Sequence, residues 1–150
     1  MIRHTLQLWR RALGLWLLLM SAEFVHGLWR VKFLALWLGD FPARQVCVFT
    51  GSLLILLITY VCIPWIPATK TRTLLGVGLG WLGLTLAFEV GFGYFVLHRT
   101  WDDFVSDFDM LHGGMFPIGL AVLALSPLIA ARWREGSTGS EAGKGSILTN

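Results

Sequence analysis

Charged residues are scarce in this chain of 150 residues. Asp, Glu, Lys and Arg together make up 14% of the sequence, whereas a soluble domain usually carries about a quarter. Hydrophobic residues make up 55%, and they stand in long blocks rather than alternating with polar residues. Blocks of about 18 or more apolar residues are typical of membrane spans. The composition therefore predicts an integral membrane protein of one domain, without a separate soluble module.

Cysteine is almost absent, and the two that are present cannot form a disulfide with each other. If Cys47 and Cys62 lie on one helix, a rise of 1.5 Å per residue puts them about 22 Å apart. A disulfide needs Cα atoms within about 7 Å. We interpret both as small apolar residues of a helix.

Recognisable catalytic motifs are also missing. The sequence has no Walker A motif, no Gly-x-Ser-x-Gly and no His-Glu-x-x-His. The stretch "GVGLGWLG" resembles a dinucleotide-binding loop, but it lies inside an apolar block and no strand precedes it. The sequence therefore requires no cofactor, and we expect a protein that is not an enzyme.

Four apolar segments are long enough to cross a bilayer core of about 30 Å. Backbone groups in lipid must bond internally, so each segment is predicted to be a helix. The predicted fold is an all-α bundle of four transmembrane helices within residues 1–135, followed by a flexible, Gly- and Ser-rich cytoplasmic tail at 136–150. The predicted spans cover residues 12–29, 46–66, 74–97 and 115–131.

Two connections between these spans have patterns of their own. The apolar stretch "FLALWLGD", residues 33–40, is too short to span; it is an interfacial helix, a re-entrant piece or an extra length of the first helix. The stretch "TWDDFVSDFDMLHGG" repeats apolar residues at helical spacing after a good N-cap, Thr100. It predicts a short amphipathic helix on the outer surface.

The cations predict the orientation of the chain. The net charge of +3 comes from Lys and Arg at the ends of apolar blocks, not from a basic stripe, so we expect no nucleic-acid partner. Eight cations fall on the side of the two termini: Arg3, Arg10, Arg11, Lys70, Arg72, Arg132, Arg134 and Lys144. Four fall on the other side: Arg30, Lys32, Arg44 and Arg99. The positive-inside rule then places both termini in the cytoplasm, and an uncleaved first span flanked by Arg fits a bacterial inner membrane.

Ionisable residues inside the predicted spans are the main functional signal. Glu23, His26 and Arg30 follow at i, i+3 and i+7 and form one polar stripe of the first helix. Glu89 lies in the same outer half of the third helix. A charge at the centre of a bilayer costs at least about 2.5 kcal/mol, so such residues are expected to face the protein interior and find partners.

These residues predict a binding site in the outer half of the bundle. Its predicted members are Glu23, His26, Arg30, Arg44, Thr50 and Glu89. Its predicted rim consists of His98, Arg99, Asp102, Asp103 and His112. The structural alternative is an interhelical salt bridge, for example between Glu89 and Arg44 or Arg30, that only fixes the packing.

Metal binding is a further alternative that the spacing does not establish. Glu23-x-x-His26 is the pair that ferritin-like di-iron bundles use, but they need two such pairs and two more Glu residues. His98 and His112 could complete a zinc or copper site with Asp102 or Asp103. The identity of any metal stays unknown from the sequence.

A face of small residues on the third span predicts close helix packing. Its members are Gly76, Gly80, Ala87 and Gly91. The partner is another helix of this chain or a second copy, and the second possibility favours an oligomer.

Three hypotheses for the function follow. The first is a transport-related homo-oligomer in which Glu23 and Glu89 bind a proton, a cation or a small charged solute. The second is an accessory or assembly subunit of a larger membrane complex, in which the buried charges only fix packing. The third is a membrane enzyme with an outer-facing metal or acid–base site that includes Glu23, His26 and residues of the rim. The first makes the most specific residue predictions.

Overall fold

The fold is described here from a computed structural model, which describes residues 2–96, 98, 100–109 and 114–145. In these residues all regular secondary structure is helical, which confirms the predicted all-α class. Four helical segments are long and apolar enough to cross a membrane: Thr5–Leu38, Phe41–Trp65, Thr71–Phe95 and Phe116–Gly136. The last three lie within five residues of the predicted spans at each end, and the first extends well beyond residues 12–29.

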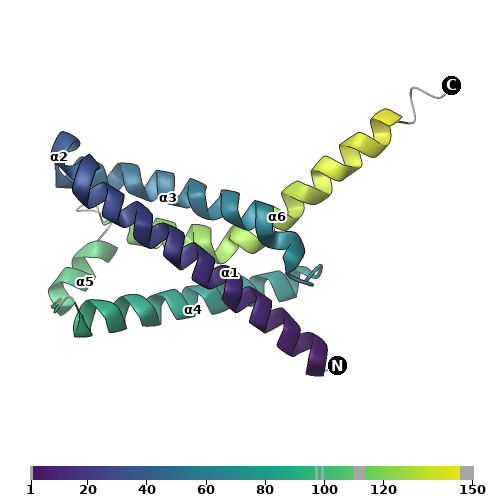
Figure 1. The fold of residues 1–150 in the computed structure, drawn as a ribbon, viewed down its shortest axis with the longest axis horizontal. Helices are drawn as coiled ribbons and strands as arrows, with labels where there is room; N and C mark the ends of the chain where they lie inside the picture. Colours follow the sequence, from purple (N-terminus) through teal and green to yellow (C-terminus); the bar gives the residue numbers. More distant parts are fainter. Residues whose placement is uncertain (1, 97, 99, 110–113, 146–150) are drawn as a thin grey trace.

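The long helices run alternately up and down (Figure 1). Figure 1 shows α1 crossing α4 and ending beside α3. The helical elements, in chain order, are α1 (Ile2–Trp29), η1 (Arg30–Leu34), α2 (Ala35–Leu38), α3 (Asp40–Cys62), η2 (Ile63–Trp65), α4 (Thr71–Phe95), α5 (Trp101–Phe108) and α6 (Phe116–Gly145). We call the end where α1 and α4 begin the terminal end, and the end that holds α2 and α5 the α5 end.

The first long helix continues through a π-helical turn. In η1 the backbone N–H of Ala35 donates to the carbonyl of Arg30, five residues earlier, and the wider turn leads into α2. The helix ends at Gly39, whose φ of 84° is not helical. Glycine suits this position because other residues adopt a positive φ at a cost. Of the three options for residues 33–40, the structure therefore shows an extra length of the first helix.

The apolar core lies towards the terminal end and joins all four long helices. Two indole groups connect α1 to α4 within it: Trp81 Nε1 donates to the carbonyl of Ala12 at 2.9 Å, and Trp16 Nε1 donates to Thr85 Oγ1 at 3.0 Å. The buried core residues are Leu8, Ala12, Leu15, Trp16, Leu19, Ile55, Ile63, Ile66, Leu74, Val77, Trp81, Leu123 and Ala130.

A chain of hydroxyl groups joins α3 to α6 where a proline interrupts α6. Pro127 has no N–H, so the carbonyl of Leu123 loses its usual helical donor. Ser126 Oγ donates to that carbonyl at 2.9 Å, and Thr59 Oγ1 of α3 donates to Ser126 Oγ at 3.4 Å. Thr59 and Ser126 are fully buried, so this chain covers the freed carbonyl inside the bundle.

The short helix α5 confirms the predicted helix after Thr100, but it ends at Phe108, before the predicted stop at Gly113-Gly114. Residues 110–113 of the predicted stretch lie outside the described residues. Helix α5 leaves Trp101 and Val105 exposed, while Phe108 packs edge-on against Phe116 of α6 with ring centroids 5.3 Å apart. Its location on an outer membrane surface stays a prediction.

The end of α6 differs in form from what the sequence predicts. The helix continues to Gly145, so the backbone of residues 136–145, where we predicted a flexible tail, is helical. This part of α6 extends past the other helices in Figure 1. Residues 146–150 of the predicted tail lie outside the described residues, and its flexibility stays a prediction.

Candidate functional site

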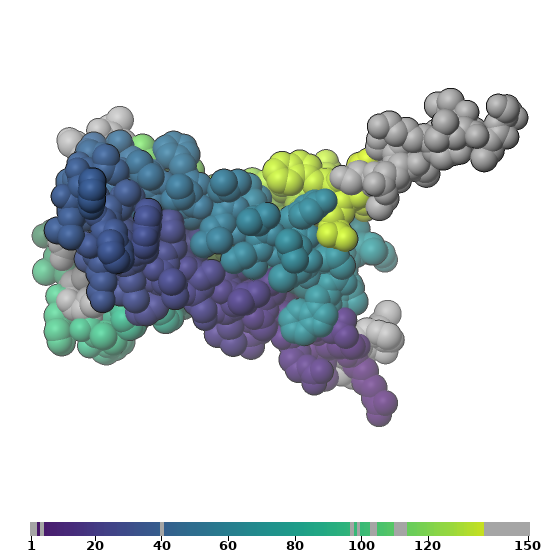
Figure 2. Space-filling model, turned by 45° about the horizontal axis from the view of Figure 1, so that its top comes forward, coloured from purple at the N-terminus to yellow at the C-terminus, as the bar shows by residue number. Residues whose placement is uncertain are grey.

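Three of the predicted site residues meet between α1 and α3. One helical turn places Glu23 and His26 on the same side of α1, and α3 brings Thr50 to them. His26 Nε2 lies 2.9 Å from Thr50 Oγ1, and His26 Nδ1 lies 3.7 Å from Glu23 Oε2. Figure 2 shows α1, in purple to blue, side by side with α3, in blue to teal. We call Glu23, His26 and Thr50 the α1–α3 site.

Thr50 Oγ1 lies within hydrogen-bond distance of its own helix and of His26. It is 2.9 Å from the carbonyl oxygen of Val46 and 2.9 Å from His26 Nε2. A threonine hydroxyl has one hydrogen to donate, so the imidazole tautomer decides which of the two groups receives it. The other ring nitrogen, Nδ1, faces the carboxyl group of Glu23.

Glu23 and His26 form a close acid–base pair. His26 Nδ1 and Glu23 Oε2 are 3.7 Å apart, which is within ion-pair distance but longer than a hydrogen bond. A pair with zero net charge costs less among apolar helices than a single charge does.

The carboxyl group of Glu23 packs directly against the backbone of α3 at Gly51. A Cβ at Gly51 would lie 2.8 Å from Glu23 Oε2, closer than such contacts normally come. The second oxygen, Oε1, is buried and has no hydrogen-bond partner among the described residues. A buried oxygen without a partner is unusual in a native structure and calls for an explanation.

The α1–α3 site is half-buried and lies near the surface of the bundle. The side chains of His26 and Glu23 are 16% and 26% exposed, and Thr50 is exposed. The His26 ring stacks on Trp29, with centroids 6.5 Å apart and planes within 13°. The backbone of α3 and the Trp29 ring thus hold the pair on two sides.

The other predicted site residues lie elsewhere or only nearby. Arg30 begins η1, one turn beyond His26, and is half-buried. Arg44 Nη1 lies 3.4 Å from Asp107 Oδ1 and connects α3 to α5. Glu89 is half-buried on α4, one turn beyond Thr85, where α4 meets α1. Glu23 and His26 contact α3 at Gly51 and Thr50.

The predicted rim is described only in part. His98 is exposed and has a positive φ of 50°, and Asp102 is exposed on α5. Arg99 and His112 lie outside the described residues, as does the side chain of Asp103. Within the described part of the chain, no group of three or more His, Cys, Asp and Glu residues could hold a metal ion.

Only part of the predicted small-residue face of α4 contacts another helix of this chain, and a second copy stays a predicted partner for the rest. A Cβ at Gly80 would lie 3.1 Å from the Trp9 ring, so this residue does contact another helix of the chain. At Gly76 and Gly91 a Cβ would meet nothing within 4 Å, and Ala87 is exposed. The closest approach is at Gly78, where a Cβ would overlap the backbone carbonyl of Ala124 in α6.

The close contacts at Gly78 and Gly51 could not be predicted from the sequence, for one reason. Nearly every residue of α3 and α4 is apolar, so periodicity does not show which side faces a neighbour. Gly51 stands between two hydroxyl residues in "TGS", a local break in the apolar pattern that could have indicated close contact.

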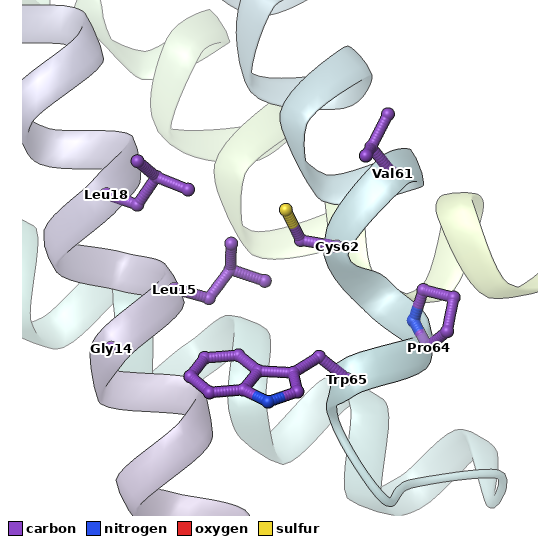
Figure 3. A pocket seen from close by; sticks show the side chains of 7 residues that line it. All are labelled: Gly14, Leu15, Leu18, Val61, Cys62, Pro64 and Trp65. Atoms are coloured by element: carbon purple, nitrogen blue, oxygen red, sulfur yellow. The ribbon is translucent and has the colours of Figure 1, made fainter.

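A second feature is a groove at the terminal end between α1 and the end of α3. It encloses about 490 Å³, and its walls are mostly apolar. Figure 3 shows the Trp65 ring reaching towards Gly14 of α1, and Cys62 Sγ pointing towards α1. Arg11 Nη1 donates to the carbonyl of Trp65 at 2.9 Å, and its guanidinium lies 5.8 Å from the centre of the Trp65 ring.

Comparison with protein-family models, with curated proteins and with solved structures finds no match for this chain. A proposal for its function therefore depends on the geometry of its own residues.

Proposed function

We propose that this chain is an integral membrane protein of a bacterial inner membrane, and that the α1–α3 site binds a proton as part of a transport function. The membrane location is supported by large apolar side chains that stay exposed on all four long helices, among them Phe24, Leu53, Leu79 and Leu125. On a soluble protein, contiguous apolar surface of this extent would cause aggregation. In a bilayer it faces lipid.

Both termini are proposed to be cytoplasmic. The terminal end carries most of the cations, as the positive-inside rule requires of the cytoplasmic side. A C-terminal fusion tests this: a fluorescent protein attached at Asn150 should fluoresce, and alkaline phosphatase at the same place should be inactive. The reverse result would contradict the topology.

The single observation that carries the proton-binding proposal is the half-buried carboxyl group of Glu23 beside His26. Its Oε2 faces His26 Nδ1, and its Oε1 is buried without a partner among the described residues. Ser52 Oγ of α3 is buried without such a partner as well, so the missing bond alone does not assign a role, and the acid–base pair supports the proposal. Intramembrane carboxylates and histidines in such settings are typical of proton relays.

The experiment is proton flux in liposomes that contain the purified protein. A pH gradient should decay faster with the wild type than in empty liposomes, and Glu23→Gln should abolish most of this difference. His26→Ala should do the same, because it removes the group that shares the proton. Glu135→Gln, a carboxyl change on α6 far from the site, is the matched control.

Equal flux for Glu23→Gln and wild type would contradict a proton site at Glu23. Glu89→Gln tests the remaining part of the transport hypothesis, because Glu89 lies on a different helix. Loss of flux in that variant alone would move the site to α4.

The second candidate function is an accessory subunit, and the surface of α4 favours it. A Cβ at Gly76 or Gly83 would meet nothing within 4 Å, so these small residues are open to a helix of another protein. Native mass spectrometry of protein gently extracted from its own membrane separates the two functions. Stoichiometric foreign subunits would favour the accessory role, and a homo-oligomer would favour transport.

A further inference from the structure

The groove at the terminal end has the shape and the lining of a site for a narrow apolar chain. Gly14, Leu15 and Leu18 form the α1 side, and Cys62 and Trp65 form the opposite side (Figure 3). A Cβ at Gly14 would touch the Trp65 ring at 3.4 Å, so Gly14 lets this ring close the end of the groove.

Positive charge gathers at the same end of the groove. Arg11 lies one turn before Gly14, and its Nη1 holds the carbonyl of Trp65. A guanidinium has five N–H donors, so several stay available for an anion. Arg10 is next to it and exposed.

No carboxylate of the neighbouring sequence compensates this charge. Residues 2–22 and 46–88 contain no Asp and no Glu, and these ranges include both walls of the groove. The two walls of the groove therefore carry positive charge without acidic residues of their own, which suits an anionic ligand.

We propose that this groove binds an anionic phospholipid, with one acyl chain against Leu15, Leu18 and Cys62 and the phosphate at Arg10 and Arg11. The guanidinium forms bidentate hydrogen bonds with phosphate, and the Trp65 ring lies where aromatic residues meet lipid headgroups. The inference rests on the membrane location proposed above and is independent of the proton site.

Cys62 provides a direct measurement of occupancy, because its Sγ points into the groove. In a Cys47→Ser variant in detergent, Cys62 is the remaining thiol, and its modification by N-ethylmaleimide can be followed by mass spectrometry. Adding dioleoyl-phosphatidylglycerol should slow the modification several-fold. Adding the same amount of dioleoyl-phosphatidylcholine should slow it much less.

Two changes should remove the protection by separate routes. The pair Arg10→Gln and Arg11→Gln removes the headgroup contacts, whereas Arg72→Gln on α4 is the matched control at the same end. Leu18→Trp fills the groove from its exposed edge, and it should prevent the phosphatidylglycerol adduct seen in native mass spectra. Gly14→Leu fills the groove from deeper in α1 and replaces Leu18→Trp if that variant does not fold.

The proposal is overturned by any of three results. These are equal protection by the two lipids, unchanged protection in the Arg10 and Arg11 variant, and a Cys62 that does not react in lipid-free protein. Sedimentation with carbonate-washed membranes tests the location separately. A soluble protein would overturn both proposals, whereas a membrane-bound protein without lipid selectivity would overturn this one alone.

Discussion

The two ends of the bundle differ in whether their buried polar groups have hydrogen-bond partners. In the terminal half and the centre, three core contacts have satisfied polar groups: Trp81 donates to a backbone carbonyl, Trp16 donates to Thr85, and Ser126 covers the carbonyl freed by Pro127. Ser52 Oγ, midway along α3, is buried without a partner among the described residues. Towards the α5 end, Glu23 Oε1 is buried without a hydrogen-bond partner in the described part of the chain.

This difference separates residues that hold the fold together from residues that need another explanation. Lipid tails are as apolar as leucine, so helices in a membrane associate through close packing and hydrogen bonds rather than through the hydrophobic effect. The terminal half has both features. At the α1–α3 site, in contrast, the acid Glu23 and the base His26 lie together, and the Glu23 carboxyl group packs against the backbone at Gly51.

The largest loss of stability is expected from adding a methyl group at the tightest helix–helix contact, that of Gly78 in α4 with α6. In Gly78→Ala the new methyl group overlaps the carbonyl of Ala124, and a backbone atom cannot rotate away. The free energy of unfolding should fall by about 3 kcal/mol, measured by SDS-driven unfolding in mixed micelles with Trp fluorescence. Gly83→Ala is the control, because its methyl group meets nothing within 4 Å; an equal loss there would contradict the packing of α4 on α6.

A smaller loss is expected from removing one indole N–H. Trp81→Phe deletes the hydrogen bond to the carbonyl of Ala12 and leaves part of a buried site empty, so unfolding should become easier by about 2 kcal/mol. The same measurement on Trp37→Phe gives the baseline, since Trp37 is 88% exposed. Similar values for the two variants would show that α1 and α4 do not depend on this bond.

The hydroxyl of Ser126 should contribute about 1 kcal/mol. Ser126→Ala uncovers the Leu123 carbonyl inside the bundle, where water cannot replace the donor. Ser21→Ala removes a hydroxyl that also bonds a carbonyl of its own helix, that of Leu17, but that helix contains no proline there. Unfolding in SDS should therefore distinguish the two serines, and equal effects would mean that Pro127 needs no such cover.

Most of the fold could be predicted from the sequence, because helices that are long and apolar enough to cross a membrane can be recognised from composition. The long helices and the short helix at residues 101–108 followed from apolar length and helical spacing. The extension of the first helix to Leu38 could not be decided, since only the backbone at Gly39 shows where the chain turns.

The site could be predicted only within one helix. Glu23 and His26 share a side of α1 because three residues make nearly one turn, and their contact follows from that spacing. Their neighbours depend on how α1 crosses α3 and α4, which the apolar sequences of those helices do not encode visibly. The predicted member Thr50 does contact the pair. Arg44 instead lies next to Asp107, and the contact at Gly51 was not predicted.

The smallest effect on stability is expected at the α1–α3 site itself, from Glu23→Gln. The amide keeps the shape of the side chain against Gly51 and can donate to His26 Nδ1, so unfolding in SDS should change by about 0.5 kcal/mol or less. Proton flux should nevertheless be lost, because an amide cannot release a proton to the imidazole. A loss as large as that of Ser126→Ala would instead show that the pair fixes the packing of α1 on α3. A stable variant without flux would mean that Glu23 serves proton binding rather than packing. The two ends of the bundle would then differ in function as well as in packing.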